Sequence, residues 1–255
     1  MTDTAASPSP RTAIVTGAAS GIGAATLLAL ARQGYSTVGI DIAREGAEAV
    51  VREAAATPGT RHLAIVADVS DEPAIVAAFD AALGFLGRLD VLVTSAGVGE
   101  TTSFMEIDVA TFRAVHEVNV IGTFLCIREA ARRMQAGARI CTVSSVAGLR
   151  GGGLSGTAAY AASKGAVLAL TKNAARALAP QGIAVNTVAP GATLTPMIAE
   201  HWKNAAHRAR VEGMSVLNRT AEAVEIAAAI AFLVSPQASS ITGSTLVADN
   251  GLVMH

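Results

Sequence analysis

The 255-residue chain has few charged residues, few aromatic residues and only two cysteines. Charged residues make up 15% of the sequence and the formal net charge is −1. Because the basic residues are also scattered, no basic patch indicates binding to nucleic acid or to an anionic membrane. Cys126 and Cys141 are too few for a disulfide framework, so we interpret them as buried thiols of a cytoplasmic protein. The five histidines show no metal-ligand spacing, and no metal site is predicted.

Long apolar runs are also missing. No uninterrupted apolar stretch approaches the roughly 18 residues of a membrane span, and the longest, Ile226–Val234, suits a buried helix. Residues 1–10 contain two prolines and no apolar run, so they are predicted to be a disordered lead-in rather than a signal peptide. Residues 11–255 are expected to form one soluble domain, with part of its 51% hydrophobic residues hidden at subunit contacts.

What the chain does contain is a regular alternation of short apolar runs and longer helical patterns. The predicted strands are Thr12–Thr16, Thr37–Ile40, Leu63–Ala67, Val91–Thr94, Arg139–Val143, Ile183–Val188 and Ser244–Ala248. The predicted helices are 21–33, 44–56, 72–86, 108–135, 158–179 and 221–234. This alternation predicts a doubly wound Rossmann fold, in which helices cover both faces of a seven-stranded, mainly parallel sheet. Ligands of such folds bind beyond the carboxyl ends of the strands.

A glycine-rich loop follows the first strand directly and leads into a helix. Glycines allow a tight turn and a close approach of the backbone to a pyrophosphate, and the free N–H groups of the helix N-terminus attract the anion. This context predicts a nucleotide-binding loop, although a packing turn is the plain alternative. The predicted contacts are Gly17, Ser20, Gly21, Ile22 and Gly23.

Asp41 closes the second strand, where a carboxylate can accept hydrogen bonds from the hydroxyls of an adenosine ribose. The same carboxylate would repel a 2′-phosphate, and neither Ser20 nor Ile42 offers a cation to offset it. Arg44 is the one basic residue close by in sequence, and it is expected to point away from the start of a helix. The predicted cofactor is therefore NAD rather than NADP.

Two further strand ends carry candidate cofactor contacts. Asp68 and Val69 end the third strand, where a carboxylate can meet the adenine amino group; capping of the following turn is the alternative role of Asp68. Ser95, Ala96 and Gly97 end the fourth strand, and such small residues let a cofactor lie against the backbone.

Tyr160 and Lys164 are four positions apart in a predicted helix, so they share one face. A nearby ammonium favours phenolate over phenol, and the pKa of Tyr160 is predicted to fall below its usual value of about 10. Such a tyrosine can transfer protons near neutral pH.

Together these residues resemble the short-chain dehydrogenase/reductase family, and the resemblance covers nearly the whole chain from Arg11. Beside Thr16–Gly23 and Tyr160–Lys164, the family's order of motifs is matched by Asn119 in VNVIG, Ser145 in VSSVAG, Pro190–Thr195 (PGATLT) and Thr242–Gly251 (TGSTLVADNG). The resemblance implies an alcohol dehydrogenase or carbonyl reductase that transfers a hydride between a small secondary alcohol or ketone and the nicotinamide. The alternative is an NADPH-dependent 3-oxoacyl (acyl-carrier-protein) reductase.

The resemblance also implies roles for single residues. Tyr160 is similar to the family's general acid/base, and Lys164 to the lysine that holds the nicotinamide ribose. Ser145, chosen over Ser144 by the alignment, would orient the substrate oxygen, and Asn119 would hold a water that links Lys164 to solvent. The nicotinamide carboxamide and its surroundings would be contacted by Pro190, Gly191, Thr193 and Thr195.

Two departures from the family pattern concern the substrate site. The chain has Thr94-Ser95-Ala96-Gly97 where Asn-Asn-Ala-Gly is usual, and Gly151–Gly156 makes the serine-to-tyrosine interval two residues longer. The pocket is expected to come from residues 147–158 and 196–215. Arg150 and Lys203 are the possible anchors for an ionic substrate group, and a neutral, fairly apolar substrate is favoured. The resemblance further implies a homotetramer in which helices 108–135 and 158–179 pair across one interface.

Overall fold

Seven parallel strands form one sheet in the order β3-β2-β1-β4-β5-β6-β9. The order reverses between β1 and β4, which is where open α/β sheets place their ligands. The predicted doubly wound Rossmann fold is confirmed. The strands are β1 Thr12–Thr16, β2 Ser36–Asp41, β3 His62–Val66, β4 Val91–Thr94, β5 Arg139–Val143, β6 Ala184–Pro190 and β9 Thr245–Ala248.

Residues 10–152 and 158–254 are described by this structure, which is a computed structural model. The predicted disordered lead-in therefore lies outside the described residues, except for Pro10. The same is true of positions 153–156 within the longer interval before Tyr160.

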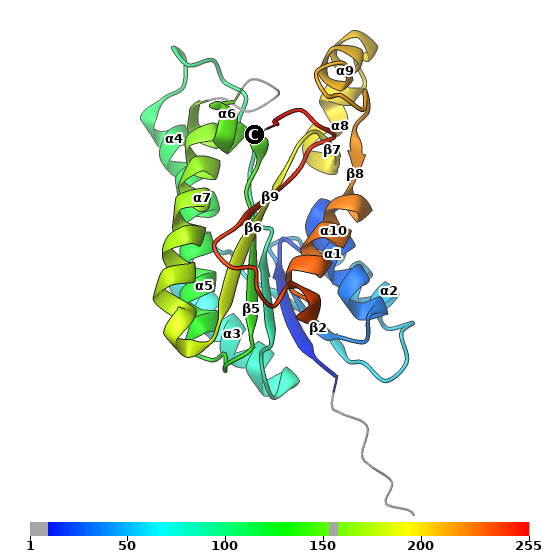
Figure 1. Cartoon of the computed structure of the whole chain (residues 1–255), viewed down its shortest axis with the longest axis vertical. Coiled ribbons are helices and arrows are strands. Elements are labelled where there is room, and N and C mark those ends of the chain that lie inside the picture. Colours follow the sequence, from blue (N-terminus) through cyan, green and yellow to red (C-terminus); the bar gives the residue numbers. More distant parts are fainter. Residues whose placement is uncertain (1–9, 153–157, 255) are drawn as a thin grey trace, which may run out of the picture.

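Helices cover both faces of the sheet, as Figure 1 shows. Helices α1, α2 and α10 lie on one side of it, and α3, α5 and α7 on the other (Figure 1). None of the described helices is both long and apolar enough to cross a membrane. The helices are α1 Gly21–Arg32, α2 Arg44–Ala54, α3 Glu72–Leu86, α4 Val109–His116, α5 Thr123–Ala131, α6 Val146–Arg150, α7 Ala158–Leu178, α8 Pro196–Trp202, α9 Ala205–Glu212 and α10 Ala223–Leu233.

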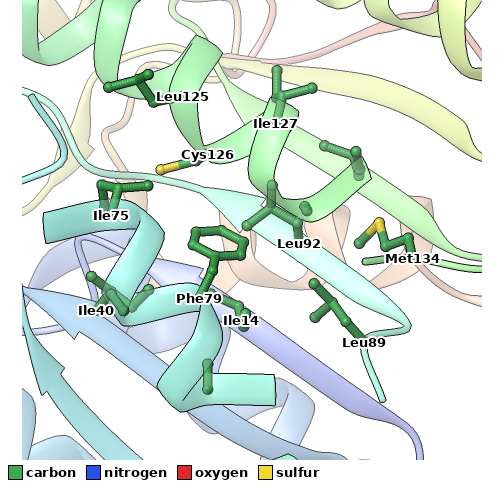
Figure 2. Packing of buried hydrophobic residues seen from close by; sticks show 14 of the residues in the cluster. Ile14, Ile40, Ile75, Phe79, Leu89, Leu92, Leu125, Cys126, Ile127 and Met134 are labelled. Atoms are coloured by element: carbon green, nitrogen blue, oxygen red, sulfur yellow. The ribbon is translucent and has the colours of Figure 1, made fainter. Parts of the chain in front are cut away.

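Two hydrophobic clusters, one on each face, hold the helices to the sheet. In the first cluster the fully buried ring of Phe79 on α3 lies among residues of α5 and of the central strands (Figure 2). Leu27 of α1 and Ile230 of α10 belong to the second, and both are fully buried. Strands buried on both faces explain why the sequence shows continuous apolar runs there rather than alternation.

The structure corrects the prediction of one helix over 108–135. Two α-helices, α4 and α5, are joined there by a π-helical segment, Glu117–Gly122, which places Asn119 in the interior. Single π-helical turns of this kind occur frequently at functional sites. The wider hydrogen-bond spacing leaves no trace in hydrophobic periodicity, so the sequence pattern reads as one helix.

The sequence analysis also missed elements that are too short or too polar to show a pattern. These are α6, α8 and α9, together with two short strands that pair in parallel, β7 Thr193–Leu194 and β8 Ala221–Glu222. In Figure 1, α6, α8 and α9 gather at the end of the molecule to which β6 leads. They therefore border the carboxyl ends of the strands.

Candidate functional site

A cavity of about 540 Å³ lies at the carboxyl ends of the parallel strands. Most residues singled out from the sequence line it, although they are spread over more than 170 positions of the chain. Gly23 and Asn119 do not line the cavity, but each lies against a residue that does, Gly23 against Gly17 and Asn119 against Gly97. The lining residues that were predicted are Gly17, Ser20, Gly21, Ile22, Asp41, Ile42, Asp68, Val69, Ser95, Ala96, Gly97, Ser145, Tyr160, Lys164, Pro190, Gly191, Thr193 and Thr195.

The loop after β1 is packed so tightly that two of its positions accept only glycine. A Cβ atom on Gly23 would lie 2.0 Å from the carbonyl oxygen of Gly17, and one on Gly17 would lie 2.6 Å from the amide nitrogen of Ala96. Gly17 also has a φ of +68°, which disfavours other residues. The loop thus brings bare backbone to the cavity at the start of α1, where a pyrophosphate fits a helix N-terminus. The residues of this loop therefore fit the pyrophosphate of a dinucleotide.

Asp41 is held by the same loop. The backbone amide of Ala19 donates to its Oδ2 at 2.9 Å, and the amide of Ala43 donates to its Oδ1 at 2.9 Å. The carboxylate is fixed at the edge of the cavity, where it can still accept hydrogen bonds because each carboxylate oxygen has more than one lone pair.

Arg44, the basic residue near Asp41 in sequence, pairs with a different acid. It begins α2, is exposed, and pairs with Glu48 at 3.5 Å along the same helix. Among the described residues that line the cavity, Lys164 is the one with a positively charged side chain. Apart from Lys164, no arginine or lysine of the described residues lines the cavity to offset the charge of Asp41.

Asp68 combines the two roles that the sequence left open. Strand β3 ends at Val66, so Asp68 and Val69 follow the strand rather than end it. The Asp68 Oδ1 accepts hydrogen bonds from the amide and the hydroxyl of Ser70, at 2.9 and 2.7 Å, which is a turn cap. The residue also lines the cavity, so its carboxylate is placed to meet a ligand.

The structure gives Ser144 and Ser145 different environments. The buried Ser144 donates its hydroxyl to the backbone oxygen of Lys164 at 2.8 Å, which ties β5 to α7. Ser145 caps α6 by accepting from the amide of Ala147 at 3.1 Å, and it also makes a side-chain hydrogen bond with Tyr160. Ser145 lines the cavity beside Tyr160, which agrees with its assignment from the motif.

Tyr160 and Lys164 face the same cavity, with the Lys164 Nζ 5.7 Å from the centre of the Tyr160 ring. The predicted fall in the Tyr160 pKa is wrong for this arrangement. Burial raises that pKa, and the hydrogen bond with Ser145 only partly offsets it. Burial also lowers the pKa of Lys164 to about 8. Loss of water disfavours both the phenolate and the ammonium.

Asn119 is fully buried in the π-helical segment and joins two parts of the site. Its Oδ1 accepts from the Val98 amide at 2.8 Å, and its Nδ2 donates to the Val98 carbonyl at 3.0 Å and to the Ser163 hydroxyl at 2.9 Å. Ser163 in turn donates to the backbone oxygen of Tyr160 at 2.7 Å. The side chain thus fastens the segment after β4 to the helix of Tyr160.

The unusual residues Thr94 and Ser95, at the end of β4 and directly after it, differ in their hydrogen bonds. Thr94 is buried, and its hydroxyl has no hydrogen-bond partner among the described residues. The next residues are held by the first strand instead: the amide of Ser95 donates to the Thr16 carbonyl at 3.2 Å, and that of Ala96 to the Thr16 hydroxyl at 3.3 Å. Backbone contacts therefore shape this part of the cavity.

The substrate side of the cavity is apolar, as expected, but its charged residue differs from the predicted ones. Neither Arg150 nor Lys203 lines the cavity, and Lys203, which directly follows α8, pairs with the exposed Glu200 at 2.6 Å. Glu100, which sequence reasoning missed, does line it and is only 8% exposed. Its place three residues after Gly97, beyond a strand end, was a signal that could have found it. The apolar lining includes Ala147, Pro196, Met197, Ile198, Trp202 and Val211.

The histidines, cysteines and acids of the described residues form no cluster of the kind that binds a metal. Within the described ranges, no group of three or more His, Cys, Asp or Glu residues could hold a metal ion. Cys126 and Cys141 are buried free thiols, as predicted, and burial raises the pKa of each to about 12.

Comparison with known proteins gives matches along nearly the whole chain. Residues 17–253 match a family model described as enoyl-(acyl carrier protein) reductase. A cis-4-hydroxycyclohexanecarboxylate dehydrogenase from Sinomonas cyclohexanicum is 43% identical over 244 residues, which are 94% of this chain and 96% of the relative. The 3-oxoacyl-(acyl-carrier-protein) reductase FabG of Staphylococcus aureus is 37% identical over 251 residues, covering 96% of this chain and 98% of the relative.

Solved structures agree with these sequence matches. A short chain dehydrogenase from Burkholderia cenocepacia J2315, in complex with NADP, superposes with a TM-score of 0.88 at 35% identity. The superposition covers 95% of this chain and 97% of that one. A dehydrogenase/reductase from Sinorhizobium meliloti 1021 has the same TM-score at 38% identity, with 96% and 95% covered.

Proposed function

This chain belongs to the short-chain dehydrogenase/reductase family and is an oxidoreductase, and we propose that it uses NAD(H) to interconvert a secondary alcohol and a ketone. The observation that carries the proposal is the meeting of Ser145, Tyr160 and Lys164 in one cavity with the glycine loop and Asp41. This arrangement supports a reaction in which Tyr160 transfers a proton next to a dinucleotide bound by the glycine loop.

The proton steps follow from the environment of each side chain. Because its pKa is raised, Tyr160 is a neutral phenol near neutral pH, which is the form that donates a proton to a ketone oxygen. Ser145, hydrogen-bonded to Tyr160, orients that oxygen. In the direction of alcohol oxidation the phenol must first release its proton, and the resulting phenolate oxygen accepts the proton of the alcohol. When bound, the nicotinamide supplies the hydride chemistry.

Lys164 has a positioning and an electrostatic role in this scheme. Its amine donates one hydrogen bond to the Val143 carbonyl at 3.0 Å, and an ammonium has two further N–H groups for the ribose hydroxyls. With a pKa of about 8, the ammonium form predominates at neutral pH and opposes the cost of forming a phenolate at Tyr160. Asn119 fixes the wall against which this amine lies, since a Cβ atom on Gly97 would be 3.1 Å from the Asn119 Oδ1 and 3.3 Å from the Lys164 Nζ.

Two observations support NAD(H) as the cofactor. The Asp41 carboxylate is fixed by two backbone amides and lines the cavity, and if it meets the adenosine ribose as proposed, like charge would oppose a 2′-phosphate there. Arg44, the nearest basic residue in sequence, is engaged with Glu48. The name of the Sinomonas relative further supports a hydroxyl group on a cyclohexane ring as the reacting group.

The reaction is tested by replacing Tyr160 with Phe. We expect turnover of a panel of secondary alcohols and ketones to fall by about 10²–10⁴-fold, because the general acid/base is lost. Binding of NADH, followed by fluorescence, should stay within about threefold of the wild type. Unchanged turnover would contradict the role of Tyr160.

An NADPH-dependent 3-oxoacyl (acyl-carrier-protein) reductase is the second candidate. The FabG relative and the NADP complex of the Burkholderia structure favour it. Turnover of one ketone panel with NADH and with NADPH separates the two, because a strong preference for NADPH would overturn the argument from Asp41.

The assembly and location of the protein are also proposals. We propose a cytoplasmic homotetramer in which α4, α5 and α7 contribute to one interface; the exposed apolar side chains Ile121 and Phe124 on this side support it. Sedimentation velocity would show a single species of about four chains. A monomer at micromolar concentration would contradict it.

A further inference from the structure

Ser163 is a fully buried residue of α7 to which the proposed reaction gives no role. It lies in the same helical turn as Tyr160 and directly precedes Lys164. Its hydroxyl donates to the backbone oxygen of Tyr160 at 2.7 Å and accepts from the Asn119 Nδ2 at 2.9 Å. Ser163 therefore joins the turn that carries Tyr160 to the π-helical segment.

The two hydrogen bonds fix the direction of the Ser163 hydroxyl. A carbonyl oxygen only accepts, so the Ser163 proton points to Tyr160, and the hydroxyl oxygen is left to accept from Asn119. An N–H group of the Asn119 amide must then face Ser163, which directs the Oδ1 of that amide the other way. The Val98 backbone requires the same orientation, because its amide donates to the Oδ1 at 2.8 Å and its carbonyl accepts from the Nδ2 at 3.0 Å. The amide thus has one orientation.

This orientation matters because the Asn119 amide and the Lys164 amine pack against the same glycine. A Cβ atom on Gly97 would lie 3.1 Å from the Asn119 Oδ1 and 3.3 Å from the Lys164 Nζ. An amide oxygen at this place favours the ammonium form of Lys164, whereas an N–H donor would oppose it. Ser163 itself does not line the cavity, so any effect on the reaction passes through its neighbours.

We propose that Ser163 is a positioning residue that ties the Asn119 amide to the helical turn of Tyr160. The inference rests on the proposed reaction, in which Tyr160 transfers the proton. Without the hydroxyl, Asn119 keeps its bonds to Val98 but loses its tie to that turn. Displacements of about 1 Å at a catalytic group cost on the order of 10²-fold in rate, so the loss should appear in kcat.

The first test compares Ser163→Ala with the matched control Thr171→Val. Thr171 is also fully buried on α7, about two turns beyond Lys164. Its hydroxyl donates to the backbone oxygen of Val167 at 2.8 Å and makes a hydrogen bond of 2.7 Å with Thr142. Each variant loses a buried hydroxyl that links two elements, so the denaturant midpoints of both should fall by similar amounts.

The two variants should differ in kinetics. With the panel of alcohols and ketones, we expect Ser163→Ala to lower kcat by about tenfold or more while the dissociation constant of NADH changes by less than about threefold. Thr171→Val should keep kcat within about twofold of the wild type, because its hydroxyl has no contact with Asn119 or Tyr160. Equal loss of kcat in both variants would mean that Ser163 has only a structural role.

A double variant shows whether the effect passes through the amide. If Ser163 acts by holding Asn119, then kcat of the double variant Ser163→Ala, Asn119→Ala should lie within about twofold of that of Asn119→Ala alone. Multiplication of the two losses would contradict this route. Should Asn119→Ala fail to fold, the comparison of Ser163→Ala with Thr171→Val still judges the proposal.

Hydrogen exchange of the Asn119 side chain tests the contact without any turnover. In protein containing ¹⁵N-labelled asparagine, the Asn119 Nδ2 protons should exchange about tenfold or more faster in Ser163→Ala than in the wild type, and at the wild-type rate in Thr171→Val. The proposal is overturned if Ser163→Ala keeps either the wild-type kcat or the wild-type exchange rate. Absence of turnover in the wild type would contradict the proposed reaction, whereas the exchange rate still judges whether Ser163 holds the amide.

Discussion

Gly148 lies directly against the backbone of Lys164: a Cβ atom at position 148 would come within 2.6 Å of the Lys164 carbonyl carbon. The contact lets α6 approach α7 without an intervening side chain. Since Ser145 caps α6 and Tyr160 lies on α7, this glycine sets how closely the two side chains meet.

Replacing Gly148 with Ala should therefore lower kcat by tenfold or more, because displacements of about 1 Å at a catalytic group cost on the order of 10²-fold. The dissociation constant of NADH should change by less than about threefold. Gly84→Ala is the control, since nothing lies within 4 Å of a Cβ there in α3, and alanine in a helix is favoured over glycine by about 0.5–1 kcal/mol. Equal kcat values for the two variants would contradict the role of the contact.

Ser144→Ala and Ser145→Ala should separate stability from catalysis. Loss of the buried Ser144 hydrogen bond is expected to reduce the free energy of unfolding by about 1 kcal/mol. Loss of the Ser145 hydroxyl removes a donor to the substrate oxygen and should lower kcat by about 10²–10³-fold with little change in cofactor binding. Denaturant titrations and steady-state kinetics on both variants test this. A larger kcat effect from Ser144 would reverse the assignment.

The cofactor preference should depend on the charge of Asp41. Asn at this position can still accept from the Ala19 amide but no longer repels a phosphate, so Asp41→Asn should raise the ratio of kcat/KM for NADPH to that for NADH by about tenfold or more. Glu45→Gln, which neutralises an exposed acid on α2, should leave the ratio unchanged. If Asp41→Asn has the same ratio as the wild type, the argument for NAD is refuted.

Burial of Lys164 should make the free energy of unfolding increase with pH in the alkaline range. Its pKa is about 8 in the folded protein, against an ordinary value of 10.5, so the unfolded chain binds more protons between these values. Free energy of unfolding should therefore rise with pH from about 8 to 10.5, relative to Lys164→Met. Lys172→Met, which removes a charge from the exposed side of the same helix, corrects for other titrations. A difference that falls across this window would show that the ammonium is not destabilised by burial.

The unpaired hydroxyl of Thr94 should be dispensable for stability. Thr94→Val replaces a buried, unsatisfied polar atom by a methyl group of similar size and is expected to raise the free energy of unfolding by about 1 kcal/mol. Thr142→Val, at the paired position on β5, removes a hydrogen bond of 2.7 Å to Thr171 and should lower it by a similar amount. Destabilisation by both substitutions would mean that the Thr94 hydroxyl has a partner.

Much of the fold was predictable because local patterns and global burial agree. The bounds of β1, β4 and β5 were predicted as they stand, since strands covered on both faces need continuous apolar runs. Helix α3 was likewise predicted correctly, because Asp71 and Gly87 are strong start and stop signals. The π-helical segment around Asn119 and the short helix α6 were not predictable, because neither produces a hydrophobic period that differs from its surroundings.

The sequence by itself determined the order of elements, the glycine loop and the spacing of Tyr160 and Lys164, because these depend on local backbone conformation and on motif spacing. Ser145 was distinguished from Ser144 only through the resemblance to the family. Tertiary structure alone decided that burial raises the pKa of Tyr160, and that Glu100 rather than Arg150 lines the substrate side. Desolvation and the walls of a cavity arise from residues far apart in the chain, and no local pattern records how closely such residues pack.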